Sequence, residues 1–242
     1  MPKSETYNID CMLYMRDVPD KFFSLAIVDP PYGINAPKMS MGGYGKYEST
    51  ATKLRKGRLN QGAGKLKNRA LNTMQCDWDC FPPSKEYFDE LFRVSKNQII
   101  WGGNYFELPP TRCVVCWDKC QPWENFSQIE MAWTSFDKPA KLFRQGSRGG
   151  NNIEVKIHPT QKPVELYAWL INTFATEGDI ILDTHMGSQS SRIAAYKLGF
   201  DYVGCELDRE YYHKGEERFQ RECLGTSVLP SGKIEIQTEL FN

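Results

Sequence analysis

The sequence predicts an α/β fold, and two observations carry that prediction. Short apolar runs that suit buried strands alternate along the chain with amphipathic stretches that suit helices. In the C-terminal half, a strand at Ile180–Asp183, a turn that contains Gly187 and a helix at Ser190–Leu198 follow one another directly. In that arrangement, backbone N–H groups approach a nucleotide closely. The length of 242 residues is enough for one sizeable domain of this class or for two small ones.

The first two expected strands are each followed by an acidic residue. Thr6–Ile9 reads as a short strand that ends at Asp10 and Cys11, with a brief helix at Met12–Arg16 after it. If this strand pairs with the next one along the chain, Asp10 lies beside Asp29. The other interpretation of Asp10 is that it caps the helix that follows, which is a common role for Asp.

The stretch around Asp29 is the most informative part of the chain. The apolar run Leu25–Val28 suits a buried strand, and Pro30 and Pro31 end it because neither proline can donate a ladder hydrogen bond. We therefore expect Asp29 and Tyr32 on a stiff turn at the carboxyl end of a strand, where open α/β sheets bind their ligands. An ordinary strand-terminating turn is the simpler alternative.

Such a turn has the right groups to hold the exocyclic amine of a nucleobase. This amine is a poor nucleophile because its lone pair is delocalised into the ring. The Asp29 carboxylate and the backbone carbonyl of Pro30 can accept both of its hydrogens, which aims the lone pair at an electrophile and stabilises the positive charge that develops. The ring of Tyr32 offers a face on which the base can stack.

The segment from Gly33 to Gln75 is strongly basic, although the whole chain is balanced with 30 basic and 30 acidic residues. A run of this length with little periodicity is normally functional or disordered inside a compact domain. Its cations, interleaved with Tyr44 and Tyr47, suit phosphate contacts and base stacking. A solvated loop without a partner is the alternative. Its basic residues are Lys38, Lys46, Lys53, Arg55, Lys56, Arg58, Lys65, Lys67 and Arg69, against the single acid Glu48.

The middle of the chain supplies one expected helix and several strands. The amphipathic stretch Lys85–Val94 predicts a helix with Ser84 as its N-cap. Three of the strands end at a tryptophan, for which core packing is favoured over base contact. The Gly-rich loop Arg144–Asn152 then offers Arg144 and Arg148 to phosphates. The expected strands are Gln98–Trp101, Arg112–Trp117, Gln128–Trp133 and, at an edge, Lys141–Phe143.

Eight cysteines raise the alternative of a metal site. Cys113 and Cys116 with Cys120 have the spacing of half a zinc site, and Cys76 and Cys80 are candidates for the other half. Against this, Cys113 begins an apolar β-type run, where cysteine is a small core residue, and Cys76 and Cys80 lack the usual two-residue gap. We therefore expect no metal, and no disulfides in a chain without a secretory signal.

The C-terminal half has the features of a cofactor site. Thr160 and Lys162 lie just before an expected helix at Pro163–Thr173, and a helix N-terminus is a natural place for an anionic group. The strand Tyr202–Cys205 leads to Glu206, a carboxylate about twenty residues beyond the glycine turn, which suits the hydroxyls of a ribose. Either feature alone is ordinary. Beyond them we expect a helix at Arg209–Glu222 and an edge strand at Lys233–Leu240.

Three stretches together resemble the S-adenosylmethionine-dependent DNA amino-methyltransferases. The run Asp29–Tyr32 (Asp-Pro-Pro-Tyr) resembles the catalytic motif of this family, and His158–Pro163 resembles the segment that holds the carboxylate of the cofactor. Asp183–Glu206 resembles the second signature block. The resemblance covers roughly residues 6–220, and its order is that of the permuted class, with the catalytic turn before the cofactor-binding half.

The resemblance implies a fold and an activity. The fold is a doubly wound, mostly parallel, seven-stranded sheet of the Rossmann-like methyltransferase type. The chain is then a single domain, 1–242, with the basic insertion at about 33–75 and a short variable loop at about 137–152. The reaction is direct transfer of a methyl group to a base flipped out of the duplex. An Asp that opens the turn favours N6 of adenine. N4 of cytosine stays open, as does a catalytically degenerate relative that only binds nucleic acid.

The resemblance also assigns roles to residues. Asp29, Pro30 and Tyr32 are implied as catalytic, Asp10 as the acceptor from the adenine amine of the cofactor, and Asp183 as the neighbour of its ammonium group. The chain departs from the family pattern in two places: Thr184-His185 replaces Pro-Phe, and Gln189 replaces a glycine that could take a positive φ. The full implied cofactor set is Asp10, Cys11, Thr160, Lys162, Asp183, His185, Gly187, Ser188 and Glu206.

The expected partner is DNA, contacted mainly through the basic insertion, because the variable loop is short for target recognition. A homodimer and an accompanying restriction nuclease both remain open. No stretch of the sequence is long and apolar enough to span a membrane, and the N-terminus lacks a signal-peptide pattern. We therefore expect a soluble protein in the cytoplasm of a bacterium, encoded by the host or by a phage.

Overall fold

The structure is a computed structural model that describes residues 1–34, 79–120, 127–146, 156–228 and 234–236. Most of the basic insertion and the end of the variable loop lie outside the described residues. The same holds for seven of the residues expected to bind nucleic acid: Lys38, Lys46, Lys53, Arg55, Lys56, Arg58 and Arg148. It also holds for Cys76 of the alternative zinc site.

The main sheet has eight strands in the order β1-β8-β7-β2-β3-β5-β4-β6, one more than the seven implied by the resemblance. The additional strand is β6, which pairs in parallel with β4 at one edge. Only β5 runs against its neighbours β3 and β4, so the sheet is mostly parallel as expected. The strands are β1 (Ser4–Tyr7), β2 (Phe23–Val28), β3 (Ser95–Trp101), β4 (Val114–Asp118), β5 (Ile129–Thr134), β6 (Lys141–Arg144), β7 (Ile180–Asp183) and β8 (Asp201–Cys205).

The first strand does not pair with the second, so the condition under which Asp10 would lie beside Asp29 is not met. β1 forms the other edge of the sheet and pairs with β8, so β8 and β7 lie between β1 and β2. The burial patterns explain this order. Side chains of β1 alternate between partly buried and exposed, as suits an edge, whereas the run from Leu25 to Val28 in β2 is buried on both faces, as suits the centre of a parallel sheet.

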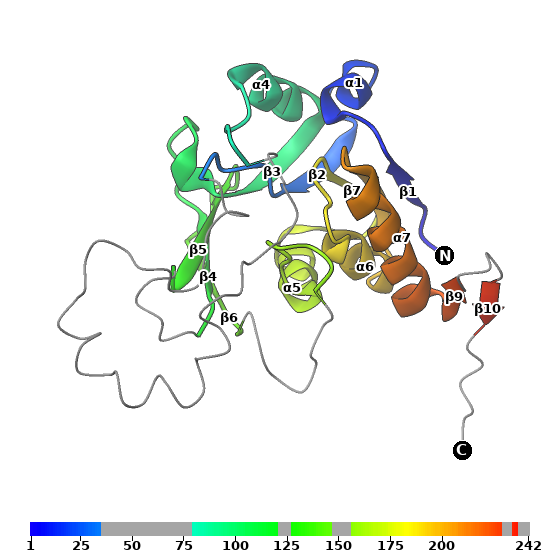
Figure 1. The fold of residues 1–242 in the computed structure, drawn as a ribbon. Coiled ribbons are helices and arrows are strands. Elements are labelled where there is room, and N and C mark those ends of the chain that lie inside the picture. Colours follow the sequence, from blue (N-terminus) through cyan, green and yellow to red (C-terminus); the bar gives the residue numbers. More distant parts are fainter. Residues whose placement is uncertain (35–78, 121–126, 147–155, 229–233, 237–242) are drawn as a thin grey trace.

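Helices cover both faces of the sheet (Figure 1). Leu25 and Ile27 of β2 belong to the core cluster under α5 (Val164–Phe174) and α6 (Ser190–Lys197). Ala26 and Val28, which alternate with them, belong to the cluster under α1 (Cys11–Arg16) and α4 (Lys85–Val94). This alternation gives the doubly wound architecture that the sequence predicts.

The predicted helices form within two residues of their expected bounds. One difference is that Pro163 is the N-cap of α5 rather than its first helical residue, with ψ at 147°. The last helix, α7 (Arg209–Cys223), packs beside α6 and is capped by Asp208, whose carboxylate accepts from the N–H groups of Glu210 and Tyr211.

The C-terminal strand is not part of the main sheet. Within the expected range Lys233–Leu240, the structure describes β10 (Ile234–Ile236), which pairs antiparallel with β9 (Thr226–Val228) in a ribbon of its own. None of the helices in the described ranges combines the length and apolarity needed to cross a bilayer. Cys113 is fully buried beside β4, as expected of a core residue.

Candidate active site

The carboxyl edge of the central strands gathers the predicted acidic residues. Asp29 follows β2, Asp183 ends β7 and Glu206 follows β8, and these three strands are neighbours in the sheet. Burial raises the pKa of Asp183 to about 7, and the negative charges of Asp29 and Glu206 add to that rise. The three side chains therefore interact and form one site at the edge where α/β sheets bind ligands.

The catalytic turn is held by hydrogen bonds in addition to its two prolines. The Asp29 carboxylate accepts from the Tyr32 hydroxyl at 2.6 Å and from the Lys162 ammonium at 2.5 Å, one on each oxygen. Burial and the negative charge of Glu130 raise the pKa of Asp29, whereas Lys162 and Tyr32 oppose that rise. Each carboxylate oxygen has a second lone pair, so Asp29 retains capacity to accept a further hydrogen.

Asp79 braces this turn from the far end of the insertion. One of its carboxylate oxygens accepts from the backbone N–H groups of Tyr32, at 2.7 Å, and of Gly33, at 2.9 Å. Gly33 has φ at +74°, and a Cβ there would lie 2.6 Å from Pro82. The sequence reasoning missed Asp79, because nothing local relates it to a turn 47 residues away.

The ring of Tyr32 is already stacked on another ring. Tyr105 lies parallel to it with centroids 5.1 Å apart, and Phe106 meets it edge-on. Gly102 also packs closely against this ring, because a Cβ there would lie 2.3 Å from it. Tyr105 itself is 46% exposed. The sequence reasoning missed Tyr105, although the glycines that close β3 at Gly102–Gly103 place it at the carboxyl edge.

Lys162 lies in the catalytic turn's hydrogen-bond network instead of standing free before the helix. Its buried ammonium reaches Asp29, the Tyr32 oxygen at 3.2 Å and the Glu130 carboxylate at 3.2 Å, which engages all three of its protons. It also lies 5.2 Å from the centroid of the Trp101 ring. A cofactor carboxylate would have to displace one of these partners to bind Lys162.

Glu130 extends the network to Lys119, which contacts its other oxygen at 2.8 Å. Lys119, Glu130, Lys162 and Asp29 thus alternate in charge, and we call these four residues the charge chain. Burial lowers the pKa of Lys162, but the two carboxylates outweigh it and hold that pKa above its usual value. The sequence reasoning missed Glu130 and Lys119, because β5 gave no sign of reaching the active-site edge.

Glu206 is held by the turns that follow β7 and β8. Its two oxygens accept from the backbone N–H groups of Gly187, at 2.9 Å, and Asp208, at 2.8 Å. Burial raises the pKa of Glu206, since neither donor carries a full charge. Asp183 likewise accepts from the Ser191 hydroxyl and the His185 N–H. The glycine turn is therefore tied to the carboxylates that were expected to bind the cofactor.

Asp10 has the capping role that the sequence left open. Its carboxylate accepts from the N–H of Met12 at the start of α1, and its charge also acts on His185 across the edge. Next to it, burial first and then the charge of Asp10 raise the pKa of Cys11 to about 12, so this thiol stays protonated. We call Asp10, Asp183 and Glu206 the carboxylate edge.

The remaining predicted residues pack around this edge. His185 lies edge-on to the Tyr87 ring, and its Nδ1 is 2.9 Å from the Thr184 hydroxyl. Burial lowers the pKa of His185 to about 4, so the ring is neutral near pH 7. The Thr160 hydroxyl lies 3.1 Å from Nδ1 of His158 in the turn before α5.

Gln189, which stands where the family pattern has a glycine, adopts a strained backbone conformation that is compensated by side-chain contacts. Gln189 itself takes φ at +60°, in the region where the family pattern has a glycine. Its side chain accepts from Arg192 at 2.8 Å and donates to Glu216 at 3.1 Å. Gly215 of α7 makes the room, because a Cβ there would lie 2.7 Å from the Gln189 side chain.

The carboxylate acceptors of this edge fit S-adenosylmethionine. Among the described residues, the carboxylate edge is bonded only to backbone N–H groups and one hydroxyl, without a lysine or arginine. Carboxylates without a cation, of which Asp183 is fully buried, favour a ligand with positive charge and many donors. The amino, ammonium, sulfonium and ribose groups of this cofactor supply that chemistry.

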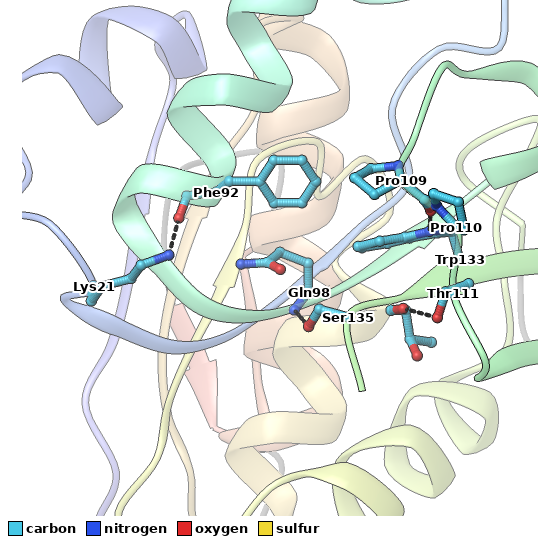
Figure 2. A pocket seen from close by; sticks show the side chains of 9 residues that line it. Lys21, Phe92, Gln98, Pro109, Pro110, Thr111, Trp133 and Ser135 are labelled. Carbon is cyan, nitrogen blue, oxygen red and sulfur yellow. Dashed lines mark hydrogen bonds between the residues drawn. The ribbon is translucent and has the colours of Figure 1, made fainter. Parts of the chain in front are cut away.

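Figure 2 shows a separate groove at the opposite, amino edge of β2 and β3. It has a volume of about 380 Å³ and includes Phe92, Pro109, Pro110 and Trp133 in its lining. Lys21 in its wall donates to the Phe92 carbonyl, so its charge is directed at the protein. None of the predicted catalytic or cofactor residues lines this groove.

The fold and the site define the class of protein. A mostly parallel sheet with helices on both faces, with the Asp29 turn and the glycine turn at one edge, is a methyltransferase fold of the Rossmann-like type. Within this fold, residues 116–217 match the family model described as DNA methylase (N6_N4_Mtase).

Relatives and solved structures agree with this assignment. Type II methyltransferase M.HpaI of Haemophilus parainfluenzae is 37% identical over 74 residues, which are 31% of this chain and 24% of that protein. Type II methyltransferase M.BglII of Bacillus subtilis is 22% identical over 86% of this chain and 66% of its own length. The aligned parts thus span less than two thirds of either relative. The structure of the M1.HpyAVI–SAM complex superposes with a TM-score of 0.53 at 17% identity, covering 88% of this chain and 98% of that one, which shows a shared fold.

Proposed function

We propose that the protein transfers a methyl group from S-adenosylmethionine to the exocyclic amine of a base flipped out of DNA, with adenine N6 as the target. The observation that carries the proposal is the position of Asp29, on a braced turn beside the carboxylate edge. The family match and the SAM complex of a structural neighbour support the choice of cofactor. In this proposal the chain is one domain, and the insertion at about 33–75 contacts the DNA.

The residues of the turn then act on the amine. Asp29 and the carbonyl of Pro30 accept its two hydrogens and direct the nitrogen lone pair. When bound, S-adenosylmethionine supplies an electrophilic methyl group whose S–C bond breaks with its electron pair left on sulfur. The nitrogen lone pair forms the new N–C bond, and the amine loses one proton through its hydrogen bond to Asp29. Asp29 must therefore be ionised, which the Lys162 ammonium favours.

The carboxylate edge is proposed to hold the cofactor. Glu206 takes the ribose hydroxyls with the lone pairs that Gly187 and Asp208 leave free, and Asp183 lies beside the ammonium group. Asp10 accepts from the adenine amine with the oxygen that does not cap α1. The other predicted residues, Cys11, Thr160, His185 and Ser188, shape the walls around the turn.

The first experiment measures transfer of a labelled methyl group from S-adenosylmethionine to unmethylated DNA, followed by nucleoside analysis. We expect N6-methyladenine from the wild type and none from Asp29→Ala. Asp20→Asn, which removes an exposed carboxylate at the amino edge, serves as the control and should keep full activity. N4-methylcytosine would keep the mechanism and change the base. Cofactor binding without any product would favour the degenerate, nucleic-acid-binding alternative.

The second experiment concerns the DNA contact. Replacing Lys53, Arg55, Lys56 and Arg58 together with Ala should weaken binding and reduce its salt dependence, because each phosphate contact releases counterions. Arg144 is a less favourable candidate than the sequence suggested, because it is paired with Asp118 at 3.2 Å. Unchanged affinity in the quadruple variant would show that other residues bind the DNA.

A further inference from the structure

Glu130 is a partly buried charge in the candidate active site that the proposed reaction does not use. It comes from β5, the one strand that runs against its neighbours, and its side chain is 26% exposed. Its two oxygens are divided between two lysines, Lys119 at 2.8 Å and Lys162 at 3.2 Å. It contacts neither the catalytic turn nor the carboxylate edge by a hydrogen bond. Its charge acts directly on Asp29 by raising the pKa of that carboxyl, so a role that favours the reaction has to pass through Lys162.

We propose that Glu130 is a positioning residue, which keeps the Lys162 ammonium charged and holds it against Asp29, so that Asp29 is oriented for the target amine. The inference rests on the proposed function and deepens it. It assigns to β5 a role in the reaction that neither the catalytic motif nor the cofactor segments supply.

The sheet itself builds this contact. Glu130 lies opposite Trp117 in the β4–β5 pairing, and the N–H of Lys119 donates to the carbonyl of Gln128. The pairing of the two strands therefore holds Lys119 and Glu130 as cross-strand neighbours. A lysine side chain is a flexible four-carbon stem, and it loses that freedom only where fixed acceptors take its protons. Of the three acceptors of Lys162, Asp29 and Tyr32 belong to the turn that acts on the substrate, whereas Glu130 belongs to β5.

Burial makes the arrangement necessary. The Lys162 side chain is 3% exposed and that of Asp29 is 14% exposed, so both charges have left water. A buried cation and a buried anion persist when each has partners of the opposite sign. In the charge chain the signs alternate and sum to zero, so each inner residue contacts two groups of opposite charge.

The other titratable groups around Lys162 do not replace Glu130. From the turn come Asp29 and Tyr32, which are the groups to be positioned. His158, before α5, is kept neutral near pH 7 because burial and the Lys162 charge lower its pKa to about 3. Burial and the nearby carboxylates raise the pKa of Tyr167 on α5, so its hydroxyl stays protonated.

These contacts fix the sign of a pH effect. Glu130 and Asp29 both raise the pKa of Lys162, against the effect of burial. Removing the charge of Glu130 therefore lowers that pKa, and Lys162 loses its proton at a lower pH. The basic side of the pH–rate profile should move to lower pH. Lys119→Met removes the other cationic partner of Glu130, so that Glu130 contacts Lys162 alone. The basic side of the pH–rate profile of this variant should therefore not move to lower pH.

The test measures single-turnover methyl transfer to unmethylated DNA against pH for the full-length wild type, Glu130→Gln, Glu130→Asp, Lys119→Met and the control Asp20→Asn. We expect the rate of Glu130→Gln near pH 8 to fall about tenfold, and the pH at which its rate declines to drop by about one unit or more. Affinities for cofactor and DNA, measured by titration, should stay within about twofold. Glu130→Asp keeps the charge and should recover part of the rate and of the pH range.

The outcomes separate this inference from the proposed function. An active wild type whose rate and pH profile are unchanged in Glu130→Gln overturns the positioning role and leaves the methyltransferase proposal intact. A loss of rate with an unshifted profile, or an equal downward move in Lys119→Met, shows a structural role only and also overturns it. An inactive wild type overturns both proposals. If Glu130→Gln does not fold, as judged by thermal unfolding, Glu130→Asp takes its place: a downward move of its profile that Lys119→Met lacks supports the positioning role, and equal profiles in the two variants overturn it.

Discussion

The charge chain and the carboxylate edge lie side by side on one edge of the sheet, and they differ in the partners of their charged groups. In the charge chain, Lys162 and Glu130 each contact two groups of opposite sign within 3.2 Å. In the carboxylate edge, Asp183 and Glu206 have only a hydroxyl and backbone N–H groups as partners among the described residues. Burial accordingly raises the pKa of both carboxyls.

The difference indicates which part of the site is complete. The charge chain needs no ligand for its electrostatic balance, so it can fix the catalytic turn before substrate arrives. The carboxylate edge lacks a cation, so it gains most from a ligand that carries one. In the proposed function, a cofactor with ammonium and sulfonium groups binds where negative charge is uncompensated, next to a turn whose geometry is already set.

The largest effect should follow from removing the centre of the charge chain. Lys162→Met leaves Asp29 and Glu130 buried without their shared cation, which should cost about 3–5 kcal/mol of stability. Methyl transfer should fall at least about 100-fold, because Asp29 is then no longer held ionised. Thermal unfolding and labelled methyl transfer measure the two effects. The control is Lys214→Met at the exposed pair with Glu210, where the loss should stay below about 1 kcal/mol. Equal losses of stability in Lys162→Met and Lys214→Met would mean that burial of the charge chain is unimportant.

The uncompensated charge of the carboxylate edge should make the affinity for S-adenosylmethionine depend on pH. The pKa of Asp183 is about 7, so its carboxylate forms as the pH rises through 7. Affinity for S-adenosylmethionine should therefore rise roughly eightfold from about pH 5.5 to 6.5, below the range where an α-amino group loses its proton. His185, with its pKa lowered to about 4, is neutral throughout.

Asp183→Asn is the matched variant for that measurement, because it keeps the shape and removes the titrating charge. Its affinity should be weaker at pH 7.5 and nearly independent of pH, as followed by calorimetric titration. The same linkage makes the free protein less stable as the pH rises from about 4 towards 7, since a carboxyl with a raised pKa binds more protons folded than unfolded. A steep pH dependence that survives in Asp183→Asn would place the titrating group elsewhere.

A smaller effect should come from the aromatic pair at the mouth of the catalytic turn. In a complex where the base inserts between Tyr32 and Tyr105, which are stacked at 5.1 Å, it stacks on both rings. Tyr105→Ala should then raise the KM for DNA about fivefold, the lower end of the value of one base–aromatic stack. Tyr105→Phe keeps the ring and should remain near wild type in the same steady-state assay. A loss in Tyr105→Phe as large as in Tyr105→Ala would assign the effect to the hydroxyl.

The smallest effect should follow from restoring the family residue in the glycine turn. Gln189→Gly removes a left-handed conformation worth about 1–2 kcal/mol of strain but also loses hydrogen bonds worth about 1 kcal/mol each, so stability should change by less than about 1 kcal/mol. Gly215→Ala should destabilise the wild type, because its Cβ meets Gln189, and should stabilise the Gln189→Gly variant. Thermal unfolding of this double-mutant cycle measures the coupling. Additive effects would show that Gly215 does not make room for Gln189.

Local pattern was enough for the elements and for the residues on the catalytic and glycine turns. The apolar run ended by Pro30 and Pro31 predicted the end of β2, since backbone chemistry alone stops a strand there. The run Ile180–Asp183 and the glycine turn after it predicted β7 and the start of α6 in the same way. These features depend on neighbours in the chain, which is why their positions were right to within two residues.

Tertiary structure decided everything that joins distant segments. Strand order is set by which faces can be buried, so β1 lies next to β8 instead of β2. The partners of Asp29 come from more than 100 residues away in the case of Lys162, and the N–H groups of its turn are bound by Asp79. The positive φ of Gln189 is tolerated because Gly215 leaves space for its side chain. A sequence specifies such contacts only through the complete fold, since long-range packing and charge pairing have no local signature.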